Sequence, residues 1–120
     1  MTEKQIEEYC GSKKGAVVEY KPEWECLWGH IEGKMFVLIG GDKEKNKCVS
    51  LKCEPELAEI YRKEYKDVVP GYYLNKQHWN SIYYPKETVS DELIKEMIDM
   101  SYTLVFNKLP KKVRESIEQE

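Results

Sequence analysis

Three β-prone segments separated by turn residues limit the fold more than any other feature of this chain. The segments are residues 26–31, 34–39 and 47–53. Glu32-Gly33 is typical of a two-residue hairpin turn, and the charged run 40–46 is typical of a longer hairpin loop. In the last segment apolar and more polar residues alternate, so that Val49 and Leu51 share one face of the strand and the more polar residues share the other. This pattern predicts an antiparallel meander with one covered face.

Helix signals flank the meander on both sides. The expected helices are residues 3–10 with a Thr2/Gln5 capping box, residues 55–64 opened by Pro55, residues 91–106 capped by Ser90, and a last one opened by Pro110. Leu57, Ile60 and Tyr61 form the expected buried stripe of the second helix, while Val113 and Ile117 form that of the last.

Two more β segments complete the prediction. Residues 16–20 are expected to form a short strand and residues 82–84 a late strand, with a turn at 69–71. A chain of 120 residues has the size of one domain. We therefore expect a single α+β domain over residues 1–120. It should be a two-layer sandwich, in which an antiparallel sheet of about five or six strands (the meander plus the late strand) packs against three or four helices.

Composition narrows the functional classes. No apolar run approaches the roughly 20 residues that cross a bilayer, and the first residues contain no hydrophobic signal region. A cytoplasmic protein with no membrane partner is therefore expected. The cysteines form no C-x-x-C pair and the histidines no zinc-like spacing, so we expect buried reduced thiols and no metal or cofactor. Catalytic signatures such as G-x-S-x-G and H-E-x-x-H are absent from the sequence, which favours a protein that is not an enzyme.

The polar segment before the late strand is the part of the chain most suggestive of recognition. Asn75, Lys76, His78 and Asn80 bring hydrogen-bonding groups and one cation together. A structural role explains the same residues equally well. In that interpretation the asparagines cap a turn, His78 forms hydrogen bonds with buried backbone groups and Trp79 fills the core. The sequence leaves both interpretations open.

Aromatic residues raise a related question. Candidates for stacking on a base are Tyr72, Tyr73, Tyr83 and Tyr84. Adjacent tyrosines on a strand point to opposite faces, so only one of the last two can face the core. Trp24 and Trp28 are four residues apart and would share a face of a strand, which favours a core role for both.

Positive charge gathers in three windows, although the net charge of the chain is −3. Residues 34–53 carry a net charge of +3, residues 75–86 of +2 and residues 108–114 of +4. The candidate phosphate contacts in these windows are Lys43, Lys45, Lys47, Lys76, Lys111, Lys112 and Arg114. If the windows meet in space they form a basic face; if they do not, these are ordinary solvated side chains.

A series of short motifs runs through the chain in a characteristic order. They are Gly33-Lys34-Met35-Phe36, Ser50-Leu51-Lys52-Cys53, Pro55-Glu56-Leu57-Ala58-Glu59, Pro70-Gly71-Tyr72, Leu74-Asn75-Lys76, His78-Trp79-Asn80, Asp91-Glu92-Leu93, Ser101-Tyr102 and Leu109-Pro110-Lys111-Lys112. With these motifs the chain resembles the MmcQ/YjbR family of small bacterial proteins over nearly its whole length. It departs from the family pattern at Ser90, where proline is common, and in the segment 21–27.

The resemblance implies an α/β sandwich with two β-hairpin wings about a helix, and DNA binding by analogy with such double-wing proteins. We therefore expect a monomeric, non-catalytic protein whose partner is double-stranded DNA, with the 43–47 hairpin and the 75–80 segment as wings. Neutralising about four to six phosphates predicts a log–log salt slope of roughly −4 to −5. The alternative is a small-ligand or protein-binding domain with a pocket lined by the Asn-Lys-His-Trp cluster.

Overall fold

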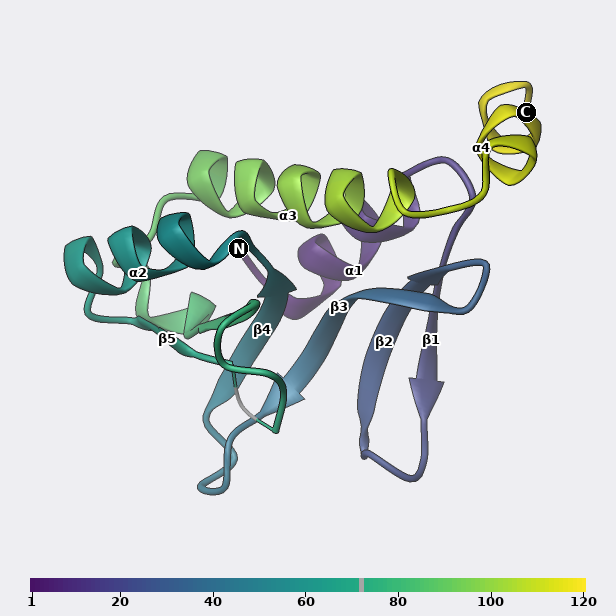
Figure 1. Ribbon diagram of the computed structural model, residues 1–120. Coiled ribbons are helices and arrows are strands. Elements are labelled where there is room, and N and C mark those ends of the chain that lie inside the picture. The colour runs from purple at the N-terminus through teal and green to yellow at the C-terminus, as the bar shows by residue number, and fades with distance from the viewer. Residues whose placement is uncertain (72) are drawn as a thin grey trace.

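The computed structural model describes residues 1–71 and 73–120, which form one antiparallel sheet and a set of helices (Figure 1). In chain order the elements are α1 (Glu3–Gly11), β1 (Ala16–Lys21), β2 (Cys26–Ile31), β3 (Lys34–Gly41), β4 (Lys47–Lys52), α2 (Pro55–Glu64), β5 (Val68–Pro70), β6 (Trp79–Ile82), the 3-10 helix η1 (Tyr84–Lys86), α3 (Asp91–Phe106) and α4 (Lys111–Glu118). The six strands lie in the order β1-β2-β3-β4-β6-β5 and pair antiparallel throughout. The predicted α+β class is confirmed.

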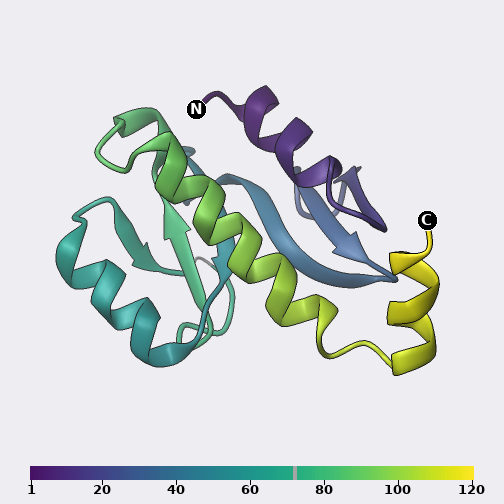
Figure 2. The same ribbon diagram turned by 90° about the horizontal axis from the view of Figure 1, so that it is seen from above.

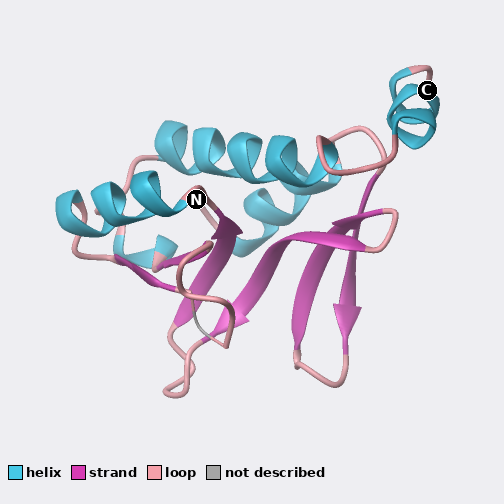
Figure 3. Cartoon of the chain, viewed as in Figure 1, coloured by secondary structure: helices cyan, strands magenta, loops and turns pink. Residues whose placement is uncertain are grey.

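The helices and the sheet form two layers. Helices α1, α2 and α3 lie on one side of the sheet, and α4 lies at a corner (Figures 1 and 2). Figure 3 separates the same layers by colour. The core between them contains Ile39 and Val49 from the sheet and Ile94 and Ile98 from α3, all with exposed fractions of 1% or less. Within the described part of the chain, no helix has the length and apolar character that crossing a bilayer requires.

A β-bulge lets two consecutive residues of β3 face the core. The register of β2 against β3 shifts between Gly29 and His30, and Phe36 is the extra residue on β3. As a result Phe36 and Val37 are both fully buried. A Cβ on Gly29 would lie 2.3 Å from Cγ1 of Val37, so only glycine fits opposite this bulge.

Local sequence signals explain several element boundaries. Thr2 and Gln5 form the predicted capping box of α1, and the Ser90 hydroxyl accepts a hydrogen bond from the backbone of Leu93 at the start of α3. Glu32 and Gly33 both have positive φ angles, 50° and 79°, as a two-residue hairpin turn of type I′ requires. These predictions are confirmed. They could be made from the sequence because each depends on residues that are close in the chain.

Three local predictions are wrong. The expected turn at 69–71 contains the end of strand β5, where Pro70 is tolerated because β5 is an edge strand. The late strand is β6 (Trp79–Ile82) rather than residues 82–84, and Tyr84 begins η1. Ile60 is 49% exposed instead of buried, because α2 turns Ala58 towards the sheet.

Candidate functional site

A cleft of about 1080 Å³ opens at the end of the sheet where the β1–β2 turn and the β3–β4 loop emerge. Alternate turns of an antiparallel meander emerge at the same end of a sheet, so these two hairpins flank the cleft. Figure 1 shows both loops below the sheet, on the side away from α3. The start of α1 and the segment after β5 complete the lining.

Lysines and carboxylates both line the cleft. Lys43, Lys45 and Lys47 line it from the β3–β4 hairpin, and all three side chains are exposed. No acidic side chain among residues 1–71 and 73–120 forms an ion pair with them. Glu23 and Glu25 line the cleft from the β1–β2 turn, and Glu3 of α1 and Asp42 of the β3–β4 loop add two more carboxylates. The three hairpin lysines therefore form no ion pair with the described residues, although Asp42 and Glu44 lie in the same loop.

Asp42 organises the loop that carries these lysines. Its Oδ1 accepts the backbone N–H groups of Glu44 and Asn46, both at 2.9 Å, and its Oδ2 accepts the Tyr83 hydroxyl at 2.8 Å and the Asn46 side-chain amide at 3.2 Å. Desolvation acts to raise the pKa of Asp42, but these hydrogen bonds outweigh it and lower the pKa. The carboxylate is therefore bound within the hairpin, while the lysines point outward.

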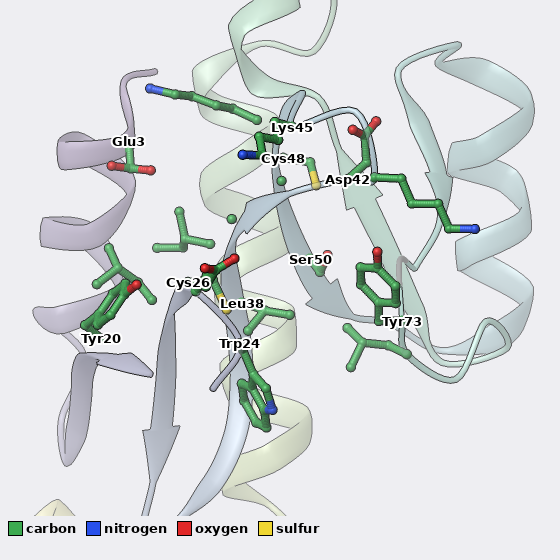
Figure 4. Close-up of a pocket in the computed structure, with 18 of the residues that line it drawn as sticks. Glu3, Tyr20, Trp24, Cys26, Leu38, Asp42, Lys45, Cys48, Ser50 and Tyr73 are labelled. Carbon is green, nitrogen blue, oxygen red and sulfur yellow. The ribbon is translucent and has the colours of Figure 1, made fainter. Parts of the chain in front are cut away.

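Three aromatic side chains in the cleft are well exposed. The exposed fractions are 59% for Tyr20, 49% for Trp24 and 75% for Tyr73. Figure 4 shows Trp24 on one side and Tyr73 on the other, with Leu38 and Ser50 of the sheet between them. The expected core role of Trp24 is wrong, because residues 22–25 form a turn that carries the ring out of the sheet.

Lys21 and Trp28 hold the Trp24 ring. The Lys21 Nζ lies 4.7 Å from the Trp24 ring centroid and 4.8 Å from that of Trp28. The two indoles meet edge to face, with centroids 5.9 Å apart. Trp24 thus contacts Lys21 and Trp28 and is still 49% exposed.

The segment 71–78 brings Tyr73 and Leu74 to the cleft. It leaves β5 where the Gly71 N–H donates to the Trp79 carbonyl at 2.7 Å, and residues 73–78 then pass over the sheet face that the helices do not cover (Figure 1). A Cβ on Gly71 would lie 2.6 Å from that of Trp79, so this close return requires glycine. Of the stacking candidates, Tyr72 lies outside the described residues and Tyr84 is buried.

The polar segment predicted for recognition is largely structural. Asn80 is 3% exposed; its Oδ1 accepts Arg62 Nε at 2.6 Å and its Nδ2 donates to the Ala58 carbonyl at 3.2 Å. Asn75 accepts the backbone N–H of Gln77 at 2.9 Å and so closes a turn. Asn80 is therefore occupied within the fold, and Asn75 acts as a turn residue.

The other members of this segment also lie away from the cleft. The backbone carbonyl of His78 accepts a hydrogen bond from the Cys53 N–H at 2.8 Å, and the His78 residue is half-buried. Trp79 is 9% exposed. The Lys76 side chain is exposed, and its carbonyl accepts a hydrogen bond from Arg62. None of Asn75, Lys76, His78 and Trp79 lines the cleft.

Arg62 on α2 is the residue that sequence reasoning missed. Besides Asn80, its guanidinium donates to the carbonyls of Lys76 and, at 3.2 Å, Trp79. One side chain therefore fixes the end of the segment 71–78 to a helix. The sequence around Arg62 is that of an ordinary solvated helix face, so no local signal distinguishes it.

The cations of α4 lie apart from the hairpin lysines. Figure 1 shows α4 at the opposite corner of the molecule from the β3–β4 loop. Lys111 lies 4.0 Å from the Glu115 carboxylate, and Arg114 Nε is buried with no hydrogen-bond partner among the described residues. The three basic windows of the sequence therefore do not meet in one face.

Two free thiols, Cys26 and Cys48, also line the cleft. Burial raises the pKa of Cys26, and it raises the pKa of Cys48 to about 11. Both are therefore neutral at physiological pH and poor nucleophiles. Within residues 1–71 and 73–120, no three His, Cys, Asp or Glu side chains gather as a metal ion would need.

These features define a small α+β domain with a cleft between two β-hairpins, one of them basic at its rim. A family model described as YjbR matches residues 11–104. The chain is also 34% identical over 119 residues to the uncharacterized protein YjbR of Escherichia coli strain K12, covering 99% of both chains. The chain belongs to the YjbR family.

Further comparisons agree with the fold. The chain is 32% identical over 93 residues to YbdF of Escherichia coli O157:H7, covering 78% of this chain and 73% of YbdF. The crystal structure of Deinococcus radiodurans protein DR2400, with a DUF419 domain, matches with a TM-score of 0.84 at 27% identity over 98% of this chain and 88% of that one. A Pseudomonas syringae protein matches with a TM-score of 0.75 at 22% identity over 88% of this chain and 99% of that one.

Proposed function

We propose that this protein is a non-catalytic DNA-binding domain that holds backbone phosphates at the β3–β4 hairpin. The observation that carries the proposal is the group of three exposed lysines at the edge of the cleft, Lys43, Lys45 and Lys47, none of which forms an ion pair with the residues that the structure describes. Lysine is a point charge that attracts phosphate, and most protein–DNA hydrogen bonds go to the backbone. The double-wing arrangement that the family resemblance implies supports the same surface.

The proposed interface is smaller than the one expected from the sequence. The α4 cations lie at another corner of the molecule, and Asn80 is occupied by Arg62, so we leave both out. Lys76 and His78 remain as a flank outside the cleft. With three lysines on phosphates, the expected log–log salt slope is about −3 instead of −4 to −5. We propose a monomer that acts in the cytoplasm on double-stranded DNA through this hairpin.

Fluorescence anisotropy with a labelled duplex tests the proposal. Raising the salt from about 50 to about 200 mM should weaken binding roughly 40-fold for three phosphate contacts. Lys43→Glu/Lys47→Glu should lose most of this binding and reduce the slope to about −1. Lys111→Glu/Lys112→Glu changes the charge by the same amount on α4 and should leave the slope near −3. The proposal fails if the wild-type protein does not bind at the lower salt, or if both double variants lose binding equally.

The cleft also supports a second candidate, a small-ligand domain. Its volume of about 1080 Å³ matches the upper end of the roughly 300–1,000 Å³ seen for small-molecule sites. The ligand would enter here and not beside Asn75 and His78, which lie outside the cleft. A thermal-shift screen with nucleotides and inorganic anions would favour this candidate if a ligand stabilises the wild-type protein while duplex DNA does not bind.

A further inference from the structure

Exposed aromatic rings converge on the cleft. The large hydrophobic side chains that are exposed in the described part of the chain are Val17, Tyr20, Trp24, Ile60 and Tyr73. Three of these five line the cleft, and they are the aromatic residues of its lining among residues 1–71 and 73–120. Exposed apolar surface that gathers beside polar rims marks a binding site more often than scattered single residues do.

We propose that the cleft holds unpaired bases of single-stranded DNA, stacked on Trp24 and Tyr73, with the phosphates at Lys43, Lys45 and Lys47. This inference rests on the proposed DNA binding at the β3–β4 hairpin, and it adds that the same site holds a single strand more tightly than the duplex. The two rings belong to different walls, Trp24 to the β1–β2 turn and Tyr73 to the segment 71–78, with Leu38 and Ser50 between them (Figure 4).

The Trp24 ring is positioned in advance for stacking. Lys21 at 4.7 Å and the edge contact with Trp28 at 5.9 Å restrict the indole, so little side-chain freedom is lost when a base stacks on it. The Trp24 residue as a whole is still 49% exposed. Proteins that bind single strands combine such aromatic platforms with a basic groove that follows the backbone.

A duplex cannot use these rings without disruption. Its bases already stack on each other, so contact with Trp24 would require unstacking at a cost in free energy. A single strand offers base faces and phosphates together. In the proposed orientation the phosphates meet the three lysines and stay away from the β1–β2 turn, where the carboxylates of Glu23 and Glu25 can accept hydrogen bonds from base amino groups.

Anisotropy with a labelled single strand of about 15 nucleotides and a duplex of the same length tests the inference, since sites of this kind span roughly 4–16 nucleotides. Wild-type protein should bind the single strand at least about 5-fold more tightly, which is the lower limit for stacking one base. Trp24→Ala should weaken single-strand binding by about 5- to 150-fold and duplex binding by less than about 2-fold. Trp24→Phe, which keeps a stacking ring, should retain most of the affinity.

The controls separate this inference from the proposed function. Ile60→Ala removes an equally exposed apolar side chain outside the cleft and should change neither affinity. Equal binding of both DNA forms by the wild type, or equal losses for both with Trp24→Ala, would overturn the single-strand inference alone. If Lys43→Glu/Lys47→Glu leaves both forms bound as before, the proposed function fails with it. Circular dichroism confirms that each variant is folded.

Discussion

Nε of Arg62 donates to Oδ1 of Asn80 over 2.6 Å, and this bond joins α2 to the first residues of β6. The same guanidinium donates hydrogen bonds to the carbonyls of Lys76 and Trp79. The segment 75–80, which the sequence suggests for recognition, is therefore anchored at one end. Asn80 also donates a hydrogen bond to the Ala58 carbonyl, which is a second link between β6 and α2. The asparagine therefore serves the packing of α2 on the sheet.

Arg62→Ala is expected to destabilise the protein by about 1–3 kcal/mol, because it leaves Oδ1 of the buried Asn80 without its donor. Asn80→Ala should cost a similar amount, and the two changes together should cost less than their sum because they break one network. Urea unfolding measures this as a lower midpoint with an unchanged slope. Lys63→Ala, an exposed neighbour on α2, is the control and should stay within about 0.5 kcal/mol of wild type. A loss for Arg62→Ala no larger than that of the control would contradict the anchoring role.

Ser101→Ala should disconnect α3 from the bulged part of the sheet. The fully buried Ser101 hydroxyl donates to the Phe36 carbonyl at 2.5 Å and accepts the Lys52 N–H at 2.9 Å. Its removal leaves two backbone groups unpaired, at an expected cost of about 1–3 kcal/mol. Hydrogen exchange reports the effect directly, since the Lys52 amide should lose protection relative to its neighbours. Thr103→Ala, on the exposed side of α3, should leave that amide unchanged.

The pH dependence of the β3–β4 loop should follow Asp42. Its pKa in the folded protein is lowered from an ordinary 3.8, because the hydrogen bonds from Asn46, Tyr83 and Glu44 outweigh desolvation. The stabilisation is therefore fully present above pH 3.8 and is lost as the pH falls through the lowered folded value. An NMR titration of the Asp42 carboxyl carbon measures this pKa, and Tyr83→Phe should raise it. An unchanged value in Tyr83→Phe would show that the hydroxyl does not contribute.

All four cysteines should react slowly with a thiol reagent in the native protein. They are free and buried, and desolvation raises the pKa of Cys10 to about 12 and that of Cys48 to about 11. The thiolate is the reacting form, so labelling at pH 8 should be slow until urea unfolds the chain, after which all four cysteines react. Rapid labelling of one thiol in the folded protein would reveal local opening at that site.

The parts of the fold that sequence reasoning predicted well depend on local chemistry. The Ser90 cap and the 3.6-residue period of α3 define a helix without reference to the rest of the molecule. The Glu32-Gly33 turn and the β2–β3 hairpin follow from short-range backbone preferences in the same way.

The parts that were missed depend on distant partners. Pro70 belongs to a strand only because β6 pairs with it, and Ile60 is exposed only because Ala58 meets the sheet. In the candidate site, too, some features follow from the local sequence and others depend on distant partners. The hairpin lysines could be named from composition, whereas the role of Trp24 and the occupation of Asn80 by Arg62 require the positions of elements far apart in sequence. Pro22 directly follows β1 and ends this strand, which is a local signal that Trp24 lies in a turn.

Gly40 lies against Cys26 at the root of the cleft, and a Cβ on this glycine would lie 2.8 Å from the Cβ of Cys26. Real Cβ atoms do not approach so closely, so any side chain at Gly40 would push the two hairpins apart. The absence of a side chain at Gly40 therefore sets how closely β2 and β3 approach at the strand ends beside the cleft. Substitutions at this pair of positions offer a means of widening the entrance while every side chain on its rim is kept.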